Sequence, residues 1–338
     1  MYYFIMMRRC ALAFCFAILF FVYAVGAVHA QAVPLKKASF IPQWSPQAQF
    51  AGYYVAYEKG IYKKHGIDLE IIQGGPNRSS FDALKNGEAT FATMWLADAI
   101  QKRARGVRIV NIAQIVQRSA LMLVTKKASG INKPADMNGK KVGLWGADFQ
   151  IQPRAFLKKY SLNVKIIPQS HSVNLFLRDG VQVASAMWYN EYHTIINAGL
   201  DPEELTAFFF YEHELNFPED GIYTTERIFN NDPGLSKAFV MASVEGWLYA
   251  FKHPDEALGI VLKYMSDAKV PASKIHQKWM LERMKDLILP RNDKDPLIGV
   301  LKEEEFAQVA GELQSGGYIK DIPAFTSFYK QSVDHAEK

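Results

Sequence analysis

Cysteine is almost missing from this chain of 338 residues. Its two cysteines, Cys10 and Cys15, both lie near the start, so residues 31–338 contain none. A stretch without thiols has no disulfide framework, no thiolate metal site and no cysteine nucleophile. The histidines match no metal-binding spacing either. We therefore expect neither a metal nor a cofactor.

A strong charge of one sign is also lacking. The formal net charge is +5, and without Arg8 and Arg9 it is about +3, with no basic stripe along the chain. This balance argues against a nucleic acid as partner. Hydrolytic motifs are absent as well, because the sequence has no Gly-x-Ser-x-Gly elbow and no His-Glu-x-x-His pair. We therefore expect a protein that is not an enzyme.

The one long apolar run is confined to the N-terminus. Arg8 and Arg9 precede apolar residues 10–28, and Ala30 stands before Gln31. This pattern predicts a signal peptide over residues 1–30, removed in the exported, periplasmic protein. An uncleaved membrane anchor is the alternative, since about 19 apolar residues also span a bilayer. Phe14 before Cys15 does not suit a lipid anchor, so we expect a soluble product.

From residue 37 onward, strand-like and helix-like segments alternate, which predicts an α/β protein with parallel sheets. Strands are expected at 37–41, 68–73, 89–93, 107–114, 120–126, 141–144, 164–167 and 183–187. Long helices are expected beyond Gly221, at 233–252, 254–265, 273–289 and 303–313. The chain has no flexible linker, so two lobes connected by a hinge are the simplest architecture.

We place the first lobe at residues 37–126 and 221–338 and the second lobe at residues 127–220. The first lobe is then discontinuous, and the C-terminal helices return to it. The chain crosses twice between the lobes. A ligand cleft between the lobes follows from this arrangement.

The segment after the first predicted strand is rich in aromatic and amide groups. Ligands of open α/β sheets bind at the carboxyl ends of strands. Trp44 offers an indole for stacking, Gln47 and Gln49 offer amides, and Tyr54 lies on the helix that follows. The alternative is that Trp44 and Tyr54 are only core and cap residues.

A glycine-rich loop follows the next strand, at residues 74–80. Glycine lets a backbone approach a ligand closely, and the hydroxyl groups of Ser79 and Ser80 suit an anion or a carbonyl group. The loop lacks the lysine of a P-loop. Ser79 alternatively serves only as the N-cap of its helix.

Three tryptophans, Trp95, Trp145 and Trp188, stand at the ends of predicted strands. Together they predict an aromatic-walled pocket that sandwiches a flat ring. Asn190 and Glu191 follow the last of them, and paired hydrogen bonds from these two side chains suit ring nitrogens and an exocyclic amine. Tyr192 completes this cluster of candidate ligand-binding residues.

Several stretches of the chain resemble one family. They are Trp44-x-Pro46, 50–56, 58–62, 66–70, Gly87-x-Ala89, 188–192 and 219–221. They resemble the thiamine-pyrimidine-precursor-binding proteins, which are solute-binding proteins of ABC importers. The resemblance covers the chain from about residue 37 to about residue 289. It is specific for the fold and weaker for the ligand.

The resemblance implies a type II periplasmic-binding-protein fold that clamps its ligand between two lobes, with extra C-terminal helices. It further implies that Trp44, Trp188, Asn190 and Glu191 hold a thiamine pyrimidine precursor, such as formylaminopyrimidine or hydroxymethylpyrimidine. The implied partners are this small molecule and an ABC permease in the inner membrane, and we expect a monomer.

Other readings of the resemblance stay open. Relatives bind riboflavin, sulfonates or nitrate-like anions, and a sensory accessory receptor is a further possibility. One branch of the family is an enzyme that makes the pyrimidine from pyridoxal phosphate and a histidine with a cysteine-rich motif. Residues 31–338 have no cysteine, which argues against this branch.

Overall fold

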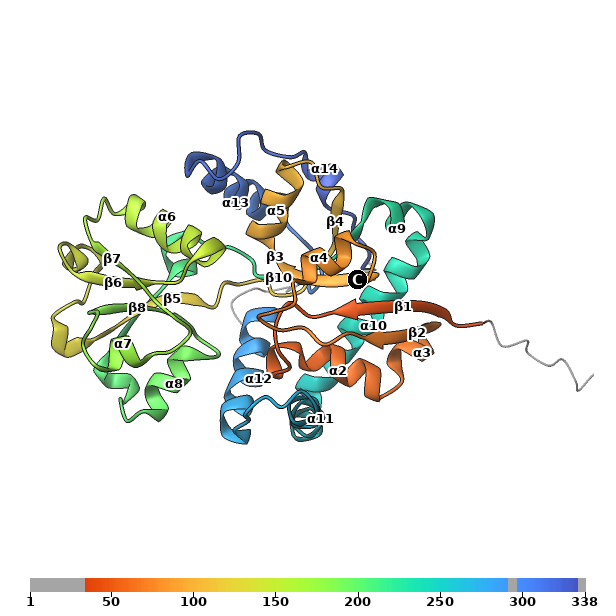
Figure 1. Cartoon of the computed structure of the whole chain (residues 1–338), viewed down its shortest axis with the longest axis horizontal. Helices are drawn as coiled ribbons and strands as arrows, with labels where there is room; N and C mark the ends of the chain where they lie inside the picture. Colours follow the sequence, from red (N-terminus) through yellow and green to blue (C-terminus); the bar gives the residue numbers. More distant parts are fainter. Residues whose placement is uncertain (1–33, 291–296, 334–338) are drawn as a thin grey trace, which may run out of the picture. The chain divides into compact units, whose positions relative to one another are not determined.

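The computed structural model of the protein describes residues 34–290 and 297–333 (Figure 1). Leu35–Lys338 forms one compact unit. The predicted signal peptide, residues 1–30, lies outside the described residues. Within the described ranges, no helix is both long enough and apolar enough to cross a membrane.

The first lobe is built on a five-stranded sheet. The strand order is β2 (Ile67–Ile71), β1 (Lys36–Ile41), β3 (Phe91–Trp95), β10 (Asp220–Thr225) and β4 (Ile109–Gln114). β1 runs parallel to β2 and β3, whereas β10 is antiparallel to β3 and β4. Every residue of β4 is buried, as expected for a strand covered on both faces.

Short helices connect the parallel strands of this sheet. They are η1 (Ala48–Phe50), α2 (Ala51–Glu58), α3 (Ile61–Lys64), α4 (Ser80–Lys85) and α5 (Leu96–Ala104). The helical stretch formed by α2 and α3 is interrupted between them. The interruption is at Gly60, whose φ of 68° is in the left-handed region that glycine adopts without strain.

The second lobe has its own five-stranded sheet. Its strand order is β7 (Lys165–Pro168), β6 (Lys141–Leu144), β8 (Val183–Met187), β5 (Leu121–Lys126) and β9 (Leu205–Phe209). Its helices are η2 (Lys127–Ser129), η3 (Pro134–Met137), η4 (Ala147–Gln150), α6 (Ile151–Lys159), α7 (Asn174–Leu177), α8 (Glu191–Asn197), η5 (Pro202–Glu204) and η6 (Phe210–His213). The predicted architecture of two α/β lobes is confirmed (Figure 1). The prediction of parallel sheets is wrong, because β10 in the first sheet and β5 in the second run antiparallel to their neighbours.

The boundary between the lobes differs from the one drawn on the sequence. The sequence predicts a first lobe whose first segment ends at Lys126. In the structure, β5 pairs with β8 and β9 and therefore belongs to the second sheet. An apolar run such as β5 can be predicted as a strand from the sequence, but its partner strands are determined only by the tertiary structure.

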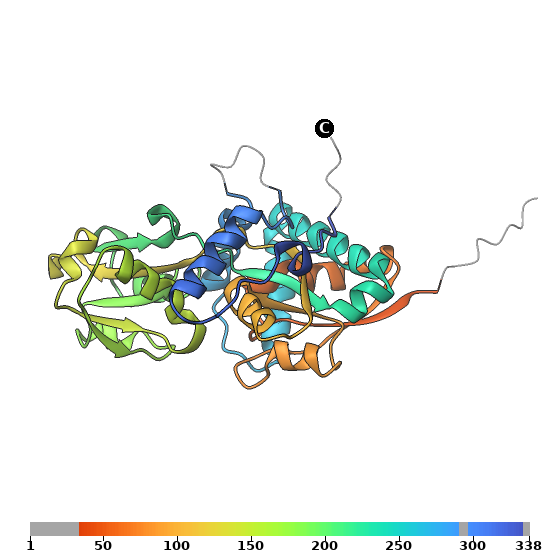
Figure 2. The ribbon, with the colours of Figure 1, turned by 90° about the horizontal axis from the view of Figure 1, so that it is seen from above.

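The C-terminal part of the chain is helical. It comprises α9 (Glu226–Asn231), α10 (Pro233–Lys252), α11 (Pro254–Asp267), α12 (Lys274–Ile288), α13 (Glu303–Ser315) and α14 (Phe325–Phe328). α10 packs on α2, α13 on α5 and α14 on β4, all in the first lobe (Figures 1 and 2). α12 also contacts α8, so this helix touches both lobes.

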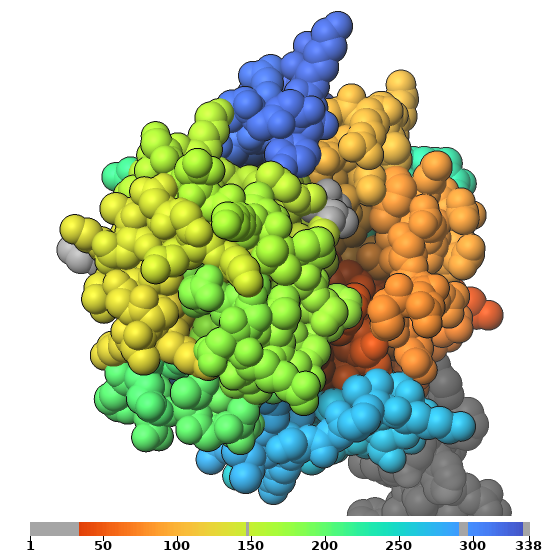
Figure 3. All heavy atoms as spheres, turned by 60° about the vertical axis from the view of Figure 1, so that its left-hand side comes forward, coloured from red at the N-terminus to blue at the C-terminus, as the bar shows by residue number. Residues whose placement is uncertain are grey.

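Two crossings connect the lobes, between β4 and β5 and between η6 and β10. They are joined by backbone hydrogen bonds, since Val116 N donates to Asp220 O and Glu219 N donates to Val116 O. The carboxylate of Glu219 accepts hydrogen bonds from Ala120 N at 2.6 Å and Leu121 N at 3.2 Å. Figure 3 shows the surface hollowed between the green segments of the second lobe and the orange segments of the first.

Candidate functional site

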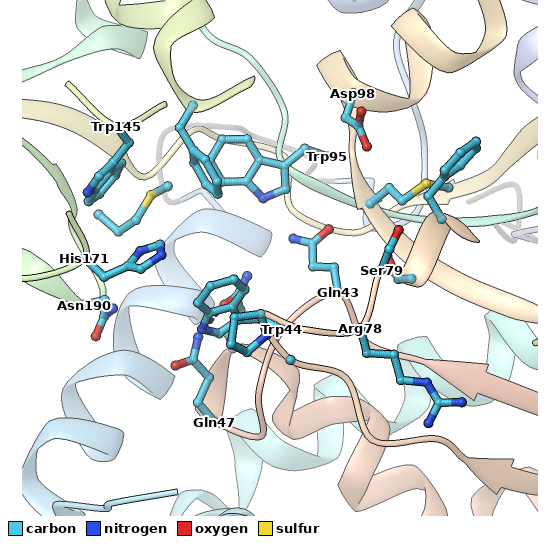
Figure 4. Close-up of a pocket in the computed structure, with 18 of the residues that line it drawn as sticks. Gln43, Trp44, Gln47, Arg78, Ser79, Trp95, Asp98, Trp145, His171 and Asn190 are labelled. Carbon is cyan, nitrogen blue, oxygen red and sulfur yellow. Dashed lines mark hydrogen bonds between the residues drawn. The ribbon is translucent and has the colours of Figure 1, made fainter. Parts of the chain in front are cut away.

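A cavity of about 420 Å³ lies where strands of both sheets end. β1 and β3 of the first lobe, and β6 and β8 of the second, direct their carboxyl ends to it, as ligand sites of open α/β sheets do. Its walls are formed by Gln43, Trp44, Gln47, Gln49, Gly75, Pro76, Arg78, Ser79, Ser80, Phe81, Met94, Trp95, Asp98, Trp145, Phe149, His171, Met187, Tyr189, Asn190 and Glu191 (Figure 4).

Three glutamines form the polar part of the wall in the first lobe. Gln43, at the end of β1, donates from Nε2 to Asp220 Oδ1 at 2.5 Å, and Gln49 donates from Nε2 to Asp220 Oδ2 at 2.8 Å. Gln47 donates from Nε2 to Gln49 Oε1 at 2.6 Å. Asp220 therefore joins Gln43 and Gln49 behind the wall, and Gln47 is joined to Gln49.

Asp220 is only 3% exposed and opens β10 opposite Trp95. Burial raises the pKa of this carboxyl group to about 7, while hydrogen bonds from Gln49, Gln43 and Trp95 act in the opposite direction. Ionised and accepting these hydrogen bonds, Asp220 is a buried charge with compensating partners.

The glycine-rich loop contributes less than its composition suggests. Ser79 lines the cavity and also caps α4, since its Oγ accepts from Asp82 N at 3.1 Å. Ser80 lines it as well, with its Oγ donating to Thr93 O at 2.8 Å. Arg78 is exposed at the edge of the cavity, 3.6 Å from the carboxylate of Glu88.

Aromatic rings from both lobes contact each other in the cavity wall. Trp95 meets Phe149 edge to face at a centroid distance of 4.6 Å, and Trp145 meets Phe149 in the same manner at 5.8 Å. Trp44 lies 5.4 Å from the ring of His171. The Trp145 indole is held in place because its Nε1 donates to Ser170 O at 3.0 Å. Such walls suit a flat ring.

The polar part of the second wall consists of Asn190 and Glu191 at the start of α8. Glu191 Oε2 accepts from Met187 N at 3.0 Å, and Glu191 Oε1 accepts from Asn190 Nδ2 at 2.8 Å. Burial raises the pKa of Glu191 to about 7. A carboxylate has about four lone-pair positions, so these two hydrogen bonds leave it able to accept more from a ligand.

Helix α12 supports both polar walls from outside the cavity. Gln277 Oε1 accepts from Ala48 N at 2.7 Å, next to the glutamines of the first lobe. One residue earlier, His276 Nε2 lies 2.9 Å from Asn190 Oδ1, which belongs to the second lobe. The position of α12 therefore affects amide groups on both sides of the cavity.

Nine of the twelve residues proposed from the sequence line the cavity. These are Trp44, Gln47, Gln49, Ser79, Ser80, Trp95, Trp145, Asn190 and Glu191. The other three lie elsewhere. Tyr54 is buried in the core of the first lobe, stacked on Tyr264 at 4.2 Å.

Trp188 and Tyr192 lie toward α12 rather than toward the cavity. β8 ends at Met187, and residues 188–190 form a turn. Met187 and Tyr189 line the cavity, whereas the Trp188 ring lies beside the guanidinium group of Arg283 on α12. The backbone carbonyl of Trp188 accepts from Trp279 Nε1 at 2.9 Å. Tyr192, on α8, has its ring 6.4 Å from that of Trp279.

Several wall residues were not singled out from the sequence. Gln43 directly precedes Trp44, so the strand-end rule already reaches it. His171 stands in the loop after β7, where the same rule applies. Phe149 and Asp98 come from η4 and α5, and nothing in the local sequence indicates that these helices face the cavity.

Within the described residues, no group of three or more histidine, cysteine, aspartate or glutamate side chains is placed to hold a metal ion. The polar groups of the cavity are mainly hydrogen-bond acceptors and amides, and its other walls are aromatic. Such a site binds and orients a small molecule.

Residues 47–257, more than half of the chain, match the family described as NMT1/THI5 like. The chain belongs to this family. Its matched part contains strands β2 to β10 and most of the cavity wall, while β1 lies before it. The family resemblance seen in the sequence is thereby confirmed.

Named relatives of this NMT1/THI5-like chain include two binding proteins. The riboflavin-binding protein RibY of Chloroflexus aurantiacus is 24% identical over 70% of this chain and 68% of its own length. The formylaminopyrimidine-binding protein of Halalkalibacterium halodurans is 21% identical over 70% of this chain and 73% of its own.

Among solved structures, the periplasmic aliphatic sulphonate binding protein SsuA from Escherichia coli superimposes with a TM-score of 0.68. It covers 89% of this chain and 94% of its own, at 13% identity. At that identity the likeness shows the fold alone. The predicted periplasmic-binding-protein fold is confirmed.

An enzyme is also similar to this chain, over a shorter part of its length. The 4-amino-5-hydroxymethyl-2-methylpyrimidine phosphate synthase of Schizosaccharomyces pombe is 24% identical over 45% of this chain and 42% of its own length. The binding proteins therefore match across both lobes of the fold, while the synthase matches less than half of the chain.

Proposed function

We propose that this protein is the substrate-binding component of an ABC importer. Its ligand is a flat heteroaromatic molecule bearing an amine, of the thiamine-pyrimidine-precursor type. The observation that carries the proposal is the cavity between the lobes, with aromatic rings on its walls and acceptor groups from both lobes. The family membership and the binding-protein relatives support it.

The acceptor groups favour a ligand with N–H donors. Glu191 keeps acceptor capacity beside the rings, and it lies opposite the glutamine wall of the first lobe. An exocyclic amine between these walls donates to oxygen atoms on both sides. Each ring face meanwhile stacks on an indole or a phenyl group.

The charges of the cavity disfavour a free anion such as a sulfonate. The carboxyl group of Glu191 lines it, as does that of Asp98, which is paired with Lys102 at 3.1 Å, and Asp220 stands behind the glutamines. Its single arginine, Arg78, is exposed at the edge. The carboxylates of Glu191 and Asp220 would repel an anion from the two lobes, and an anion without a ring would gain little from aromatic walls.

Riboflavin is the second candidate, because of the size of the cavity. A volume of about 420 Å³ exceeds what one pyrimidine ring fills and falls in the range of pockets for larger organic ligands. A tricyclic flavin also stacks well between indoles. A relative named as riboflavin-binding gives this alternative further support.

The rest of the proposal concerns where and with what the protein acts. We propose export to the periplasm with removal of residues 1–30, a monomeric state and delivery of the ligand to a permease in the inner membrane. We further propose that the protein performs no chemistry on the ligand. The lack of cysteine in residues 31–338 supports this, since it leaves no counterpart of the synthases' cysteine-rich motif.

One purification tests the compartment and the ligand together. The protein, expressed with its leader and isolated from the periplasm without refolding, is analysed by native mass spectrometry. We expect a polypeptide that begins at Gln31 and carries a bound small molecule. Recovery of the full chain from the membrane fraction would contradict the proposed export.

Calorimetric titration of the emptied protein then ranks the ligands. Formylaminopyrimidine, hydroxymethylpyrimidine, thiamine, riboflavin and taurine are compared at one pH and salt concentration. Tightest binding of an aminopyrimidine supports the first candidate, and tightest binding of riboflavin supports the second. Binding of taurine alone would show that the ring-recognition proposal is wrong.

A further inference from the structure

The carboxylate of Asp220 lies behind the cavity wall, in contact with two of the three wall glutamines. It is 3% exposed and does not line the cavity itself. Above its pKa of about 7, the side chain of Asp220 is an ionised carboxylate, which only accepts hydrogen bonds. Gln43 and Gln49 must therefore both turn their NH₂ groups toward Asp220, at the distances of 2.5 Å and 2.8 Å given above.

The orientation of one glutamine amide determines the orientation of the next. With its NH₂ group on Asp220, Gln49 presents Oε1 on its other side, and that oxygen accepts from Gln47 Nε2 at 2.6 Å. Gln47 must then point its own Oε1 away from Gln49. One buried charge thus sets the direction of three amides in a row.

The chain of amides ends in two carbonyl oxygens, Gln43 Oε1 and Gln47 Oε1. Both residues line the cavity, and among the described residues neither oxygen accepts a hydrogen bond. Figure 4 shows the Gln43 oxygen on the side of Ser79 and the Gln47 oxygen on the side of Asn190. The first lobe therefore offers acceptors to a ligand, as Glu191 does from the second lobe.

We propose that Asp220 is a positioning residue that sets ligand selectivity, by fixing the wall glutamines with their carbonyl oxygens available to the ligand. The cavity then selects rings that carry N–H donors and rejects analogues with a carbonyl group at the same position. The inference rests on the proposed function for its ligand, but the orientation of the amides exists in the empty protein.

The neutral isostere Asp220→Asn removes the constraint. Asparagine offers one acceptor oxygen and one NH₂ group, so only one of the two glutamines keeps its orientation. The other must turn its carbonyl oxygen toward the new NH₂ group. If Gln49 turns, Gln47 turns with it, because their hydrogen bond reverses. A donor then replaces an acceptor in the wall.

The first test needs no ligand. Side-chain amide resonances of ¹⁵N-glutamine-labelled protein are recorded for wild type and for Asp220→Asn, with assignments from Gln43→Leu and Gln49→Leu. We expect the Gln43 and Gln49 resonances to shift in Asp220→Asn. Asp68→Asn, the same change at an exposed position in β2, leaves them unchanged. Unmoved resonances in Asp220→Asn overturn the inference.

The second test measures selectivity. Affinities are compared for 4-amino-5-hydroxymethyl-2-methylpyrimidine and for its 4-oxo analogue, in which a carbonyl acceptor replaces the amine donor. We expect wild type to prefer the amine by about 5- to 150-fold. In Asp220→Asn the preference falls to within about threefold, and Asp68→Asn keeps the wild-type ratio.

The outcomes separate the two proposals. An unchanged ratio in Asp220→Asn overturns the inference while the proposed function stands. Wild type that binds neither pyrimidine overturns the proposed ligand and the selectivity, and the resonances then decide the orientation of the amides alone. If Asp220→Asn does not fold, Gln49→Leu is used instead. This change removes the hydrogen bond that orients Gln47 and must lower the preference for the amine.

Discussion

Glu191 is a buried acidic side chain at the start of α8. It stands at the first position of α8, where the helix dipole favours a negative charge, and it is 7% exposed. It accepts hydrogen bonds from the protein and also lines the cavity. A buried carboxylate in this position is favoured by the helix dipole and remains available to a ligand.

Replacing Glu191 with glutamine removes the charge and keeps the shape. Ligand N–H groups then lose a charged acceptor in a dry pocket, so we expect aminopyrimidine affinity to fall by about 5- to 150-fold. The thermal stability of the empty protein at pH 8 should stay equal or rise, because a buried charge is gone. Calorimetry and thermal unfolding measure the two effects.

Tyr192→Phe is the control for this substitution. Tyr192 lies next in the chain on the same helix and does not line the cavity. The Tyr192→Phe protein should bind the aminopyrimidine as tightly as wild type does. A Glu191→Gln protein that binds the pyrimidine as tightly as wild type would show that the carboxylate does not contact the ligand.

At the scale of elements, the close contact of α2 and α10 positions the glutamine wall. α2 directly follows η1, which carries Gln49. A Cβ atom at Gly246 would lie 2.2 Å from the backbone oxygen of Gly52 and 2.6 Å from Ala56 Cβ. The two helices therefore approach each other at a distance that only glycine permits at position 246.

Gly246→Ala should force α10 away from α2. Overpacking of a close contact destabilises a folded protein, so we expect the free energy of unfolding to fall by about 1–3 kcal/mol. Gly259→Ala on α11 is the matched control, since its Cβ meets no atom within 4 Å. That change should stabilise the protein by about 0.5–1 kcal/mol. Urea denaturation that ranks the two variants in the opposite order contradicts this packing argument.

At the scale of the whole molecule, three buried carboxyl groups lie at or near the meeting of the lobes. Burial raises the pKa of Glu191 and Asp220 to about 7. Burial and the charge of Asp220 raise the pKa of Glu219 to about 8. Glu219 also joins the two crossings through its hydrogen bonds to Ala120 and Leu121.

These shifts predict how stability depends on pH. An acid with a higher pKa in the folded protein binds more protons when folded, so its contribution to the free energy of unfolding is complete below about pH 4 and is lost as the pH rises through 7 to 8. Burial lowers the pKa of His193 and His276, whose contribution has the opposite sign and is complete above about pH 6.5.

Of these five groups, only the three carboxyl groups change their protonation in the folded protein between pH 6.5 and 8.5. We expect the free energy of unfolding of the empty protein to fall across this window, measured by urea denaturation at several pH values. Glu219→Gln should make the fall smaller, because one titrating group is removed. Stability that rises from pH 6.5 to 8.5 would mean that these carboxyl groups are not buried as described.

Much of this protein is determined by its sequence alone. The alternation of strand-like and helix-like segments predicted two α/β lobes, and the strand-end rule directed attention to Trp44, Trp95, Trp145 and Glu191, which all line the cavity. These inferences succeed because hydrophobic periodicity and the geometry of parallel sheets act over short stretches of chain.

Only the tertiary structure decided the rest. The sheet to which β5 belongs depends on which strands pair, and the separation of Trp188 from the cavity depends on the direction in which one side chain leaves the chain after β8. The role of Asp220 depends on its hydrogen bonds to Gln43 and Gln49, and on the hydrogen bond from Gln47 to Gln49, which form only when segments distant in sequence meet. Side-chain direction and long-range pairing are set by packing across the whole fold, and no local pattern records them.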